Sequence, residues 1–294
     1  MKSGFVSILG KSNVGKSTLL NAILHQKISI VTDKQQTTRN AIKGIYNDDD
    51  SQIVFIDTPG IHKARQKLGE EMNNMALNSI NDSEVVVIVI DASHDIDDEV
   101  KKIYQRVNKK HIPIVTVINK IDLIKIDRSL KLKEEIASIN DGPIIEMVAK
   151  EGFNVEELIK TIKGILPEGP QYYDKDTVSD IDVIFQIKEI IREKALNILK
   201  DEVPHSLAIY MKEINWDENP LPIYADIIVE KDSQKGIVIG KNGQRLKNIG
   251  QKARQPIEAL LHKHVFLSLT VKVNEDWRNK DSLLSTLGYK TKKE

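Results

Sequence analysis

One octapeptide near the N-terminus restricts the fold of this chain more than any other feature. Gly10-Lys11-Ser12-Asn13-Val14-Gly15-Lys16-Ser17 fits the pattern G-x-x-x-x-G-K-[ST]. An apolar segment (5–9) precedes it directly and an amphipathic segment (16–25) follows it. This context is typical of a buried strand joined to a helix by a phosphate-binding loop, and it argues against a chance match in an ordinary turn. The octapeptide therefore predicts an α/β fold.

The spacing of the motif suits a polyanion. Its glycines let the backbone wrap around phosphates with successive N–H groups pointing inward. Lys16 can then reach the β- and γ-phosphates, and the Ser17 hydroxyl can bind Mg²⁺. The helix that begins at Lys16 adds the positive end of its dipole. We expect residues 10–17 to hold the phosphates of a nucleotide.

The first domain, residues 1–168, alternates apolar runs with helical patterns. Strands are expected over 5–9, 53–56, 85–90, 114–118 and 144–148, and helices over 16–25, 69–79, 99–107, 134–139 and 155–165. Alternation of this kind predicts right-handed crossovers and a mainly parallel sheet with helices on both faces.

Two prolines and a glycine end the helical pattern at Leu166-Pro167-Glu168-Gly169-Pro170, and we place a linker over 169–180. A helix is expected over 181–200, with Ser179 or Asp180 as its N-cap. Strands follow over 206–216 and 223–229, helices over 235–239 and 243–262, and a last strand over 265–273. The order α-β-β-α-α-β predicts a second, α+β domain over 181–280, with 281–294 as a C-terminal tail.

Composition removes several classes of function. The chain has no cysteine, which excludes disulfide frameworks, cysteine-based zinc sites and thiol catalysis. Its longest apolar run, 85–90, is far shorter than the ~20 residues of a membrane span. Lys+Arg and Asp+Glu both number 43, so overall charge predicts no polyanionic partner, and such a partner must be argued from local clustering.

A second motif, Asp57-Thr58-Pro59-Gly60, follows the apolar run 53–56. On its own this tetrapeptide is an ordinary turn. After a parallel strand it lies at the ligand edge of the sheet. There Asp57 would hold Mg²⁺ and the Gly60 N–H would approach the γ-phosphate.

A third motif, Asn119-Lys120-Ile121-Asp122, follows the apolar run 114–118. The Asp122 carboxylate can accept hydrogen bonds from the N1–H and the exocyclic amine of guanine. Adenine offers neither donor in that arrangement, so it would leave polar groups unpaired. Three motifs in this order predict GTP or GDP as the ligand.

Basic residues gather around a Gly-x-x-Gly turn in the second domain. Seven lie between positions 231 and 254 against one acid, Asp232. A solvated helix face is one interpretation. The turn Gly240-Lys241-Asn242-Gly243, preceded by the apolar residues 237–239, favours an RNA-binding KH domain, in which such a turn clamps the RNA backbone. The expected RNA-binding residues are Lys235, Ile239, Gly240, Lys241, Asn242, Gly243, Arg245 and Lys247.

The ordered motifs, together with Gln36-Thr37-Thr38-Arg39 and the C-terminal Gly-x-x-Gly domain, resemble the Era family of bacterial ribosome-assembly GTPases over nearly the whole chain. The resemblance implies a P-loop GTPase domain followed by a type II KH domain. It also implies GTP hydrolysis and binding of 16S ribosomal RNA near its 3′ end in 30S subunit maturation. A cytoplasmic monomer with peripheral association at the inner face of the cell membrane is implied as well.

The resemblance also assigns residues. It implies that Thr38, or its neighbour Thr37, closes on Mg²⁺ with Ser17 and Asp57 when the γ-phosphate is present. Lys16, Asn13, Thr38 and Gly60 are the expected catalytic group. The expected nucleotide-binding set comprises Gly10 to Ser17, Asp57 to Ile61, Asn119 to Asp122, and Val148, Ala149 and Lys150.

Two features concern affinity and rate. The loop after the fifth predicted strand reads Val148-Ala149-Lys150 where the family usually begins Ser-Ala, and we expect the Ala149 N–H to meet guanine O6. Ile61 stands where many GTPases carry a water-positioning glutamine, so hydrolysis should be slow. His62 is a conceivable substitute, although a lone loop histidine is more often a solvated one. Asn13 either helps to hold K⁺ beside the phosphates or faces water.

Two other functions remain open from sequence. One is an RNA chaperone that uses GTP only as a structural ligand. The other is a tRNA-modification GTPase, whose family has additional domains and a C-terminal cysteine that this chain lacks. Trp277 either stacks on RNA or, as tryptophans more often do, packs against the final predicted helix.

Overall fold

The computed structural model describes residues 1–34, 36–200 and 203–290. Their contacts divide into two units. The first comprises Met1–Val31, Thr38–Ala64 and Gly69–Asp180. The second comprises Thr32–Thr37, Arg65–Leu68 and the chain from Ile181 onward. Two short segments of the N-terminal half therefore belong, by their contacts, to the C-terminal unit, which the sequence did not predict.

The described residues of the first unit form a six-stranded sheet in the order β2-β3-β1-β4-β5-β6. β2 pairs antiparallel with β3, and the other pairs are parallel, so the mainly parallel sheet is confirmed. The sequence missed β2, an edge strand whose apolar pattern is interrupted by Gly44 and by polar residues. The strands are β1 (Lys2–Leu9), β2 (Ile42–Asn47), β3 (Ser51–Asp57), β4 (Val85–Asp91), β5 (Ile114–Asn119) and β6 (Ile144–Met147).

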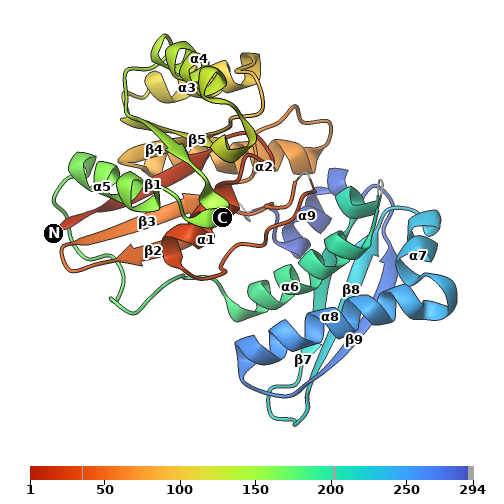
Figure 1. Cartoon of the computed structure of the whole chain (residues 1–294). Coiled ribbons are helices and arrows are strands. Elements are labelled where there is room, and N and C mark those ends of the chain that lie inside the picture. The colour runs from red at the N-terminus through yellow and green to blue at the C-terminus, as the bar shows by residue number, and fades with distance from the viewer. Residues whose placement is uncertain (35, 201–202, 291–294) are drawn as a thin grey trace. The chain divides into compact units, whose positions relative to one another are not determined.

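The sheet is covered on both faces (Figure 1). Val86, Ile88 and Ile90 of β4 belong to the hydrophobic core that α2, α3 and α4 share, whereas alternate residues point to the opposite face, where α1 and α5 contact each other. Because both faces are buried, the central strands are continuous apolar runs. The helices are α1 (Lys16–Leu24), α2 (Lys67–Asn78), α3 (Asp98–Asn108), α4 (Ile126–Ala137) and α5 (Val155–Ile165).

The segment predicted as a linker, 169–180, belongs to the first unit and follows its sheet edge. The Gln52 side chain accepts from Tyr173 N at 2.9 Å, and Ile45 N donates to Val178 O at 2.8 Å. The Tyr172 ring meets Phe5 edge-on at 4.9 Å between centroids. The prolines and the polar composition indicated an extended segment, and its attachment comes from residues of β1, β2 and β3.

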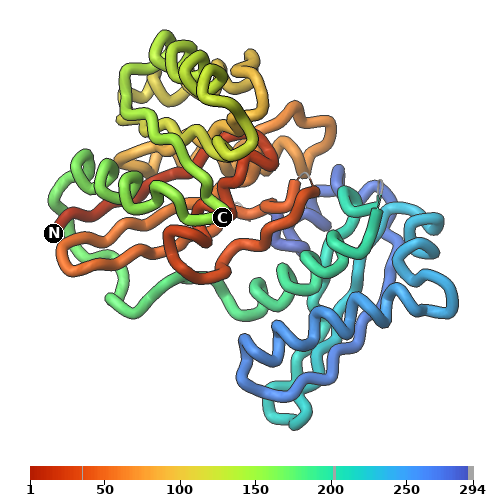
Figure 2. The backbone as a smooth tube through the Cα atoms, in the orientation of Figure 1, coloured from red at the N-terminus to blue at the C-terminus, as the bar shows by residue number. Residues whose placement is uncertain are grey.

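The second unit has the order α-β-β-α-α-β that the sequence predicted. β7 pairs antiparallel with β8, and β8 pairs parallel with β9. Helices pack on the sheet, and the backbone path is followed most easily in Figure 2. The elements are α6 (Val183–Ile198), β7 (Ala208–Ile214), β8 (Leu221–Val229), α7 (Asp232–Ile239), α8 (Gln244–Leu261), β9 (Val265–Val273) and α9 (Asp281–Leu287).

The N-cap of α6 is Asp182, not Ser179 or Asp180. The Asp182 side chain accepts from Ile184 N at 2.5 Å, while the Ser179 hydroxyl donates to Lys43 O in the first unit. The expected tail also contains α9, and its last four residues, 291–294, lie outside the described part of the chain.

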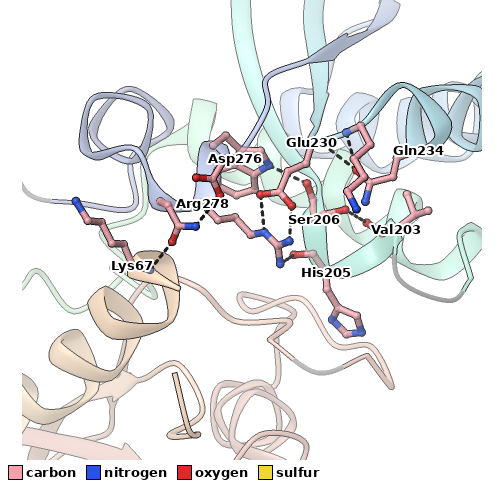
Figure 3. A network of polar contacts seen from close by, with 11 residues as sticks. Lys67, Val203, His205, Ser206, Glu230, Gln234, Asp276 and Arg278 are labelled. Carbon is pink, nitrogen blue, oxygen red and sulfur yellow. Dashed lines mark hydrogen bonds and ion pairs between the residues drawn. The ribbon is translucent and has the colours of Figure 1, made fainter. Parts of the chain in front are cut away.

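Trp277 is completely buried, which excludes its stacking on RNA. Its indole N–H donates to Ser206 O at 2.8 Å, and its ring stacks on Tyr289 with centroids 5.9 Å apart. The next residue, Arg278, forms an ion pair with Glu230 at the end of β8 (Figure 3). The residues after β9 are thus built into the second unit.

Among the described residues, we find no helix with the length and apolar character needed to span a bilayer.

Candidate nucleotide and RNA sites

The phosphate-binding loop lies between β1 and α1, as predicted. Gly10 has φ +151° and Gly15 has φ +102°. A Cβ at Gly10 would come within 2.4 Å of Val89 O, and a Cβ at Gly15 within 2.2 Å of the Asn119 amide. Both glycines are therefore required by conformation and by space. Because Gly15 offers no side chain to cap α1, the first N–H groups of that helix remain available to an anion.

The Lys16 side chain lies inside this loop. Its ammonium donates to Lys11 O at 2.7 Å and to Gly10 O at 3.2 Å. Burial lowers the pKa of Lys16 to about 8, and the charge of Asp57 opposes this shift. A buried ammonium hydrogen-bonded to neutral carbonyls is poised to gain an anionic partner.

Ser17, Thr38 and Asp57 converge beside Lys16. The Ser17 hydroxyl donates to Asp57 Oδ2 at 2.7 Å and lies 2.7 Å from the Thr38 hydroxyl. Burial raises the pKa of Asp57, whose Oδ1 is buried with no hydrogen-bond partner among the described residues. Two hydroxyls and a carboxylate with an unused oxygen are ligands that suit Mg²⁺, so these residues fit the expected metal.

The structure separates Thr38 from Thr37, which the sequence could not. The Thr37 hydroxyl lies 2.6 Å from the Thr32 hydroxyl and donates to Lys34 O. The Thr38 hydroxyl instead lies against that of Ser17. The geometry favours Thr38 as the ligand.

The loop after β3 lies against the phosphate-binding loop. A Cβ at Gly60 would meet Ser12 N at 2.7 Å, and Ile61 N donates to Gly10 O at 3.1 Å. The Thr58 hydroxyl donates to Ile8 O at 2.7 Å, and Pro59 lies between these anchors. The His62 ring contacts Gly60 O at 2.9 Å. His62 is therefore engaged with the backbone of its own loop.

Asn119 joins three loops at the carboxyl end of β5. Its amide donates to Val14 O at 2.8 Å and accepts from Ala149 N at 2.9 Å. Lys120 donates to Asn13 O at 2.8 Å and to Asp91 at 2.6 Å. These contacts bring the first and third motifs together.

Asp122 lies on the short turn Ile121–Leu123 that follows, and its side chain is exposed. The Ala149 N–H donates to Asn119 Oδ1 at 2.9 Å, and its contact with guanine O6 stays a prediction. Val148 is buried beside it, and Lys150 is exposed on the same turn. The carboxylate of Asp122 is thus accessible to a base, whereas the Ala149 N–H already has an acceptor.

A second candidate site lies on α8 and β9. The Gly-x-x-Gly turn connects α7 to α8, with positive φ at Gly240 (+71°), Asn242 (+52°) and Gly243 (+74°). Lys241 and Asn242 are exposed at its tip, and Lys235 and Ile239 are half-buried on α7. Arg245 donates to Ile237 O, so part of its donor capacity is used to cap α7.

A groove of about 450 Å³ runs from this turn between α8 and β9. Gly243 and Lys247 of the predicted set line it. The sequence missed the rest of the lining. It comprises the polar residues Gln251 and Arg254, together with Gly250 and the apolar residues Leu246, Val265, Phe266, Leu267 and Leu269. Gly250 adds no side chain between α8 and β9, where a Cβ at this position would lie 3.7 Å from Leu269 Cδ1. Leu246, Gly250 and Arg254 are spaced four residues apart. From this spacing the sequence could have predicted that they share one face of the helix.

Comparison with known proteins places both sites in context. The profile of a family described as "50S ribosome-binding GTPase" matches residues 5–120, and that of the KH domain matches residues 202–278. The chain is 45% identical to GTPase Era of Staphylococcus epidermidis over 290 residues, which is 98% of this chain and 97% of that protein.

Two solved structures are similar over 98% of this chain and 99% of theirs, each with a TM-score of 0.94. One, 40% identical, is a tyrosine-to-alanine variant of Aquifex aeolicus Era bound to GDP·AlF4⁻. The other, 41% identical, is Era in complex with MgGDPNP and nucleotides 1506–1542 of 16S ribosomal RNA.

Proposed function

We propose that this chain, which belongs to the Era family of GTPases, binds Mg²⁺·GTP at the loop 10–17. We also propose that it binds 16S ribosomal RNA in the groove of its KH domain. The observation that carries the proposal is the convergence of the Ser17, Thr38 and Asp57 oxygens beside the buried Lys16 ammonium. This arrangement offers opposite-charge partners to both a phosphate chain and its metal ion.

Within the phosphate site, each residue has a distinct task. The Gly10–Gly15 backbone encloses the phosphates, and Lys16 faces the β- and γ-phosphates. Ser17, Thr38 and Asp57 hold Mg²⁺, which supplies charge neutralisation at the transferred phosphoryl group. The Gly60 N–H approaches the γ-phosphate, because the loop after β3 lies in contact with Ser12.

Guanine recognition rests on Asp122, with Asn119 as the residue that aligns the loops around it. Asp122 is exposed, so a base can reach it. Asn119 is buried; its side chain donates one hydrogen bond to Val14 O and accepts one from Ala149 N. The half-buried Lys120 and Ile121 and the exposed Lys150 border the base. We expect the guanine O6 contact to come from the loop 148–150, in which the Ala149 N–H donates to Asn119.

Hydrolysis proceeds without a glutamine at position 61, so we propose that electrostatics dominate the rate. Asn13 is exposed in the phosphate-binding loop with φ +64°, and its carbonyl accepts from Lys120. This position allows the Asn13 side chain to help bind K⁺ beside the phosphates, where the ion would stabilise developing negative charge.

The RNA surface combines a charged turn with an apolar groove. Phosphates meet the backbone of Gly240–Gly243 and the cations Lys241 and Lys247, and bases lie over Leu246, Leu267 and Leu269. The RNA-bound Era of known structure supports the 3′ region of 16S ribosomal RNA as the ligand. We propose a role in assembly of the 30S subunit on this basis.

The same family membership supports a cytoplasmic monomer with peripheral association at the inner face of the cell membrane. The alternative of an RNA chaperone with structural GTP is disfavoured by the complete set of metal and phosphate residues. A tRNA-modification GTPase is disfavoured by the full-length match to Era. A single-turnover GTP assay separates the chaperone from the GTPase, because a structural ligand would not be hydrolysed.

The RNA partner is tested by crosslinking in cells that produce this protein, followed by sequencing of the bound RNA. We expect reads concentrated at the 3′ end of 16S ribosomal RNA, and their disappearance when Lys241 and Asn242 are replaced by Asp. Enrichment of tRNA, or reads spread evenly over all ribosomal RNA, would contradict the proposal.

A further inference from the structure

Asp57, at the carboxyl end of β3, is a buried carboxylate whose two oxygens have different surroundings. The residue is completely buried. Oδ2 accepts from the Ser17 hydroxyl at 2.7 Å and from the Ser29 hydroxyl at 3.0 Å, whereas Oδ1 has no hydrogen-bond partner among the described residues. Burying a carboxylate is costly unless its hydrogen bonds are well placed, so this unequal arrangement calls for a functional explanation.

The two hydroxyls that donate to Oδ2 have different tasks. Ser17 is one of the expected Mg²⁺ ligands, so its oxygen is also needed by the metal ion. Ser29 lies in the connection that follows α1, outside the three motifs that predict the nucleotide site. Of the two donors, Ser29 is therefore the one whose role is confined to the carboxylate.

Ser29 is held in place by the side chain of Asn21. The Asn21 amide donates to Ser29 O at 2.8 Å, and its Oδ1 accepts from Ile28 N and Ser29 N, both at 2.9 Å. One side chain thus binds both backbone groups of Ser29, which is 1% exposed. Asn21 lies four residues after Ser17 on α1, so the two share one face of that helix. This face supplies a direct donor to Asp57 and the anchor of the second donor.

Rotation of the carboxylate decides which Asp57 oxygen has the two donors. The terminal torsion of an aspartate is broad and roughly two-fold, so it does not fix the orientation by itself. Donors from two separate segments, both in the first unit, hold Oδ2 in its place. Oδ1 consequently keeps its lone pairs for another partner.

We propose that Ser29 is a positioning residue for the Mg²⁺ site: its hydroxyl, anchored by Asn21, holds Asp57 Oδ2 and keeps Oδ1 available to the metal ion. The inference rests on the proposed function, because it takes Asp57 as a residue that holds Mg²⁺ when the nucleotide is bound. Ser29 acts on the metal ion only through Asp57.

The test measures how much Mg²⁺ the unmodified protein and Ser29→Ala each need for tight binding of GDPNP. Fluorescence titrations with GDPNP are carried out over a series of Mg²⁺ concentrations and in EDTA. Removing a hydrogen-bond partner of a metal-binding group typically lowers metal affinity about 10- to 100-fold, so the half-maximal Mg²⁺ concentration should rise about tenfold or more. The affinity for GDPNP in EDTA should stay within about twofold, because the phosphate-binding loop is unchanged.

Ser83→Ala is the matched control. Ser83 is a buried serine of the same unit that precedes the amino end of β4, and its hydroxyl donates to Ser79 O at 2.8 Å. This variant removes a comparable hydroxyl at the opposite edge of the sheet and should keep the Mg²⁺ requirement of the unmodified protein. If Ser29→Ala does not fold, Ser29→Cys keeps a side chain of similar size with a weaker donor and should also raise the Mg²⁺ requirement.

A double variant shows whether Ser29 acts through Asp57. Asp57→Ala removes the carboxylate and should raise the Mg²⁺ requirement by itself. Adding Ser29→Ala to Asp57→Ala should change that requirement by less than about twofold, whereas a general weakening of the fold would add its full effect.

Three results would overturn the inference: an unchanged Mg²⁺ requirement in the folded Ser29→Ala protein, equal falls in GDPNP affinity with Mg²⁺ and in EDTA, or additive effects in the double variant. The second and third would mean that Ser29 supports the fold without acting on the metal site. Failure of the unmodified protein to bind GDPNP, or binding that does not depend on Mg²⁺, would instead refute the proposed function, so the two failures are distinguishable.

Discussion

The protonation of Lys16 gives a quantitative test of the phosphate site. Burial lowers the pKa of Lys16 to about 8 from its ordinary value of 10.5. Phosphates placed against the ammonium favour its charged form, so binding should raise this pKa again. A nucleotide that binds near or above pH 8 must therefore take up a proton.

The size of the uptake follows from the pKa. With a pKa of about 8, Lys16 is about one-tenth neutral at pH 7, half neutral at pH 8 and nine-tenths neutral at pH 9. Binding of GDP should then take up about 0.1, 0.5 and 0.9 proton at these three pH values. Above pH 8 the affinity should fall, approaching tenfold per pH unit.

Calorimetric titration with GDP in buffers of different ionisation enthalpy measures the uptake directly. EDTA is included, since Mg²⁺ would release any proton that the buried Asp57 carries, a change of opposite sign. The second pKa of a phosphate is about 6, so the phosphates contribute little at pH 8. Lys16→Arg is the control, because its guanidinium stays charged at all three pH values. Any proton uptake that remains in this variant belongs to the guanine base.

A binding enthalpy that does not depend on the buffer at pH 8 would refute the reasoning, because it would mean that Lys16 is fully charged before the nucleotide arrives. The same uptake in Lys16→Arg would assign the proton to another group.

Three further changes test the site residues. Lys16→Ala should abolish tight GTP binding in equilibrium dialysis, because the ammonium of Lys11, the other lysine of the loop, is paired with Asp97; unchanged affinity would contradict the phosphate assignment. Asp122→Asn should change the preference from guanine to xanthine by about 1–3 kcal/mol, since an amide replaces an acceptor with a donor. A competition assay in which GTP still outcompetes XTP would reject Asp122 as the residue that recognises the base. If Asn13 helps to bind K⁺, GTP hydrolysis should be faster in K⁺ than in Na⁺ at equal ionic strength and Asn13→Ala should remove the difference, whereas equal rates for the unmodified protein would exclude the role.

The sequence predicted the elements that local patterns specify. β4 is a continuous apolar run because both of its faces are buried, and the loop 10–17 is defined by glycines whose conformations no other residue adopts easily. β2 lacked such a pattern, since an edge strand that carries Gly44 and polar residues resembles a loop. α4 begins at Ile126, before the predicted start at residue 134. Its apolar Ile126 and Leu130 are exposed in the structure, so apolar residues in its first turns do not mark the buried face.

The features that the sequence could not supply depend on contacts between distant residues. The Arg192 guanidinium donates to the Thr37 carbonyl from 155 positions away, and no spacing rule connects the two residues. The groove beside the Gly-x-x-Gly turn needs β9 to lie alongside α8, so its apolar lining became visible only with the tertiary structure. The acceptor of the Ala149 N–H likewise depends on the end of β5 lying next to the loop after β6.

The central claim, that one chain joins a GTP site to an independent RNA-binding surface, is tested most directly with Lys241→Asp/Asn242→Asp. Both residues are exposed on the turn, so the two new negative charges should repel RNA without disturbing the fold. Asn108→Asp/Lys109→Asp, at exposed positions of the first unit, changes the net charge equally and serves as the control.

The measurement is the affinity of each protein for a synthetic RNA with the 3′-terminal sequence of 16S ribosomal RNA, with GTP affinity and melting temperature determined on the same preparation. We expect the RNA affinity of the turn variant to fall at least about tenfold, or 1.4 kcal/mol. Its salt dependence should flatten by about 0.7 for each phosphate that the turn no longer binds. GTP affinity and melting temperature should match those of the control. Intact RNA binding in the turn variant, or simultaneous failure of RNA and GTP binding, would contradict the central claim.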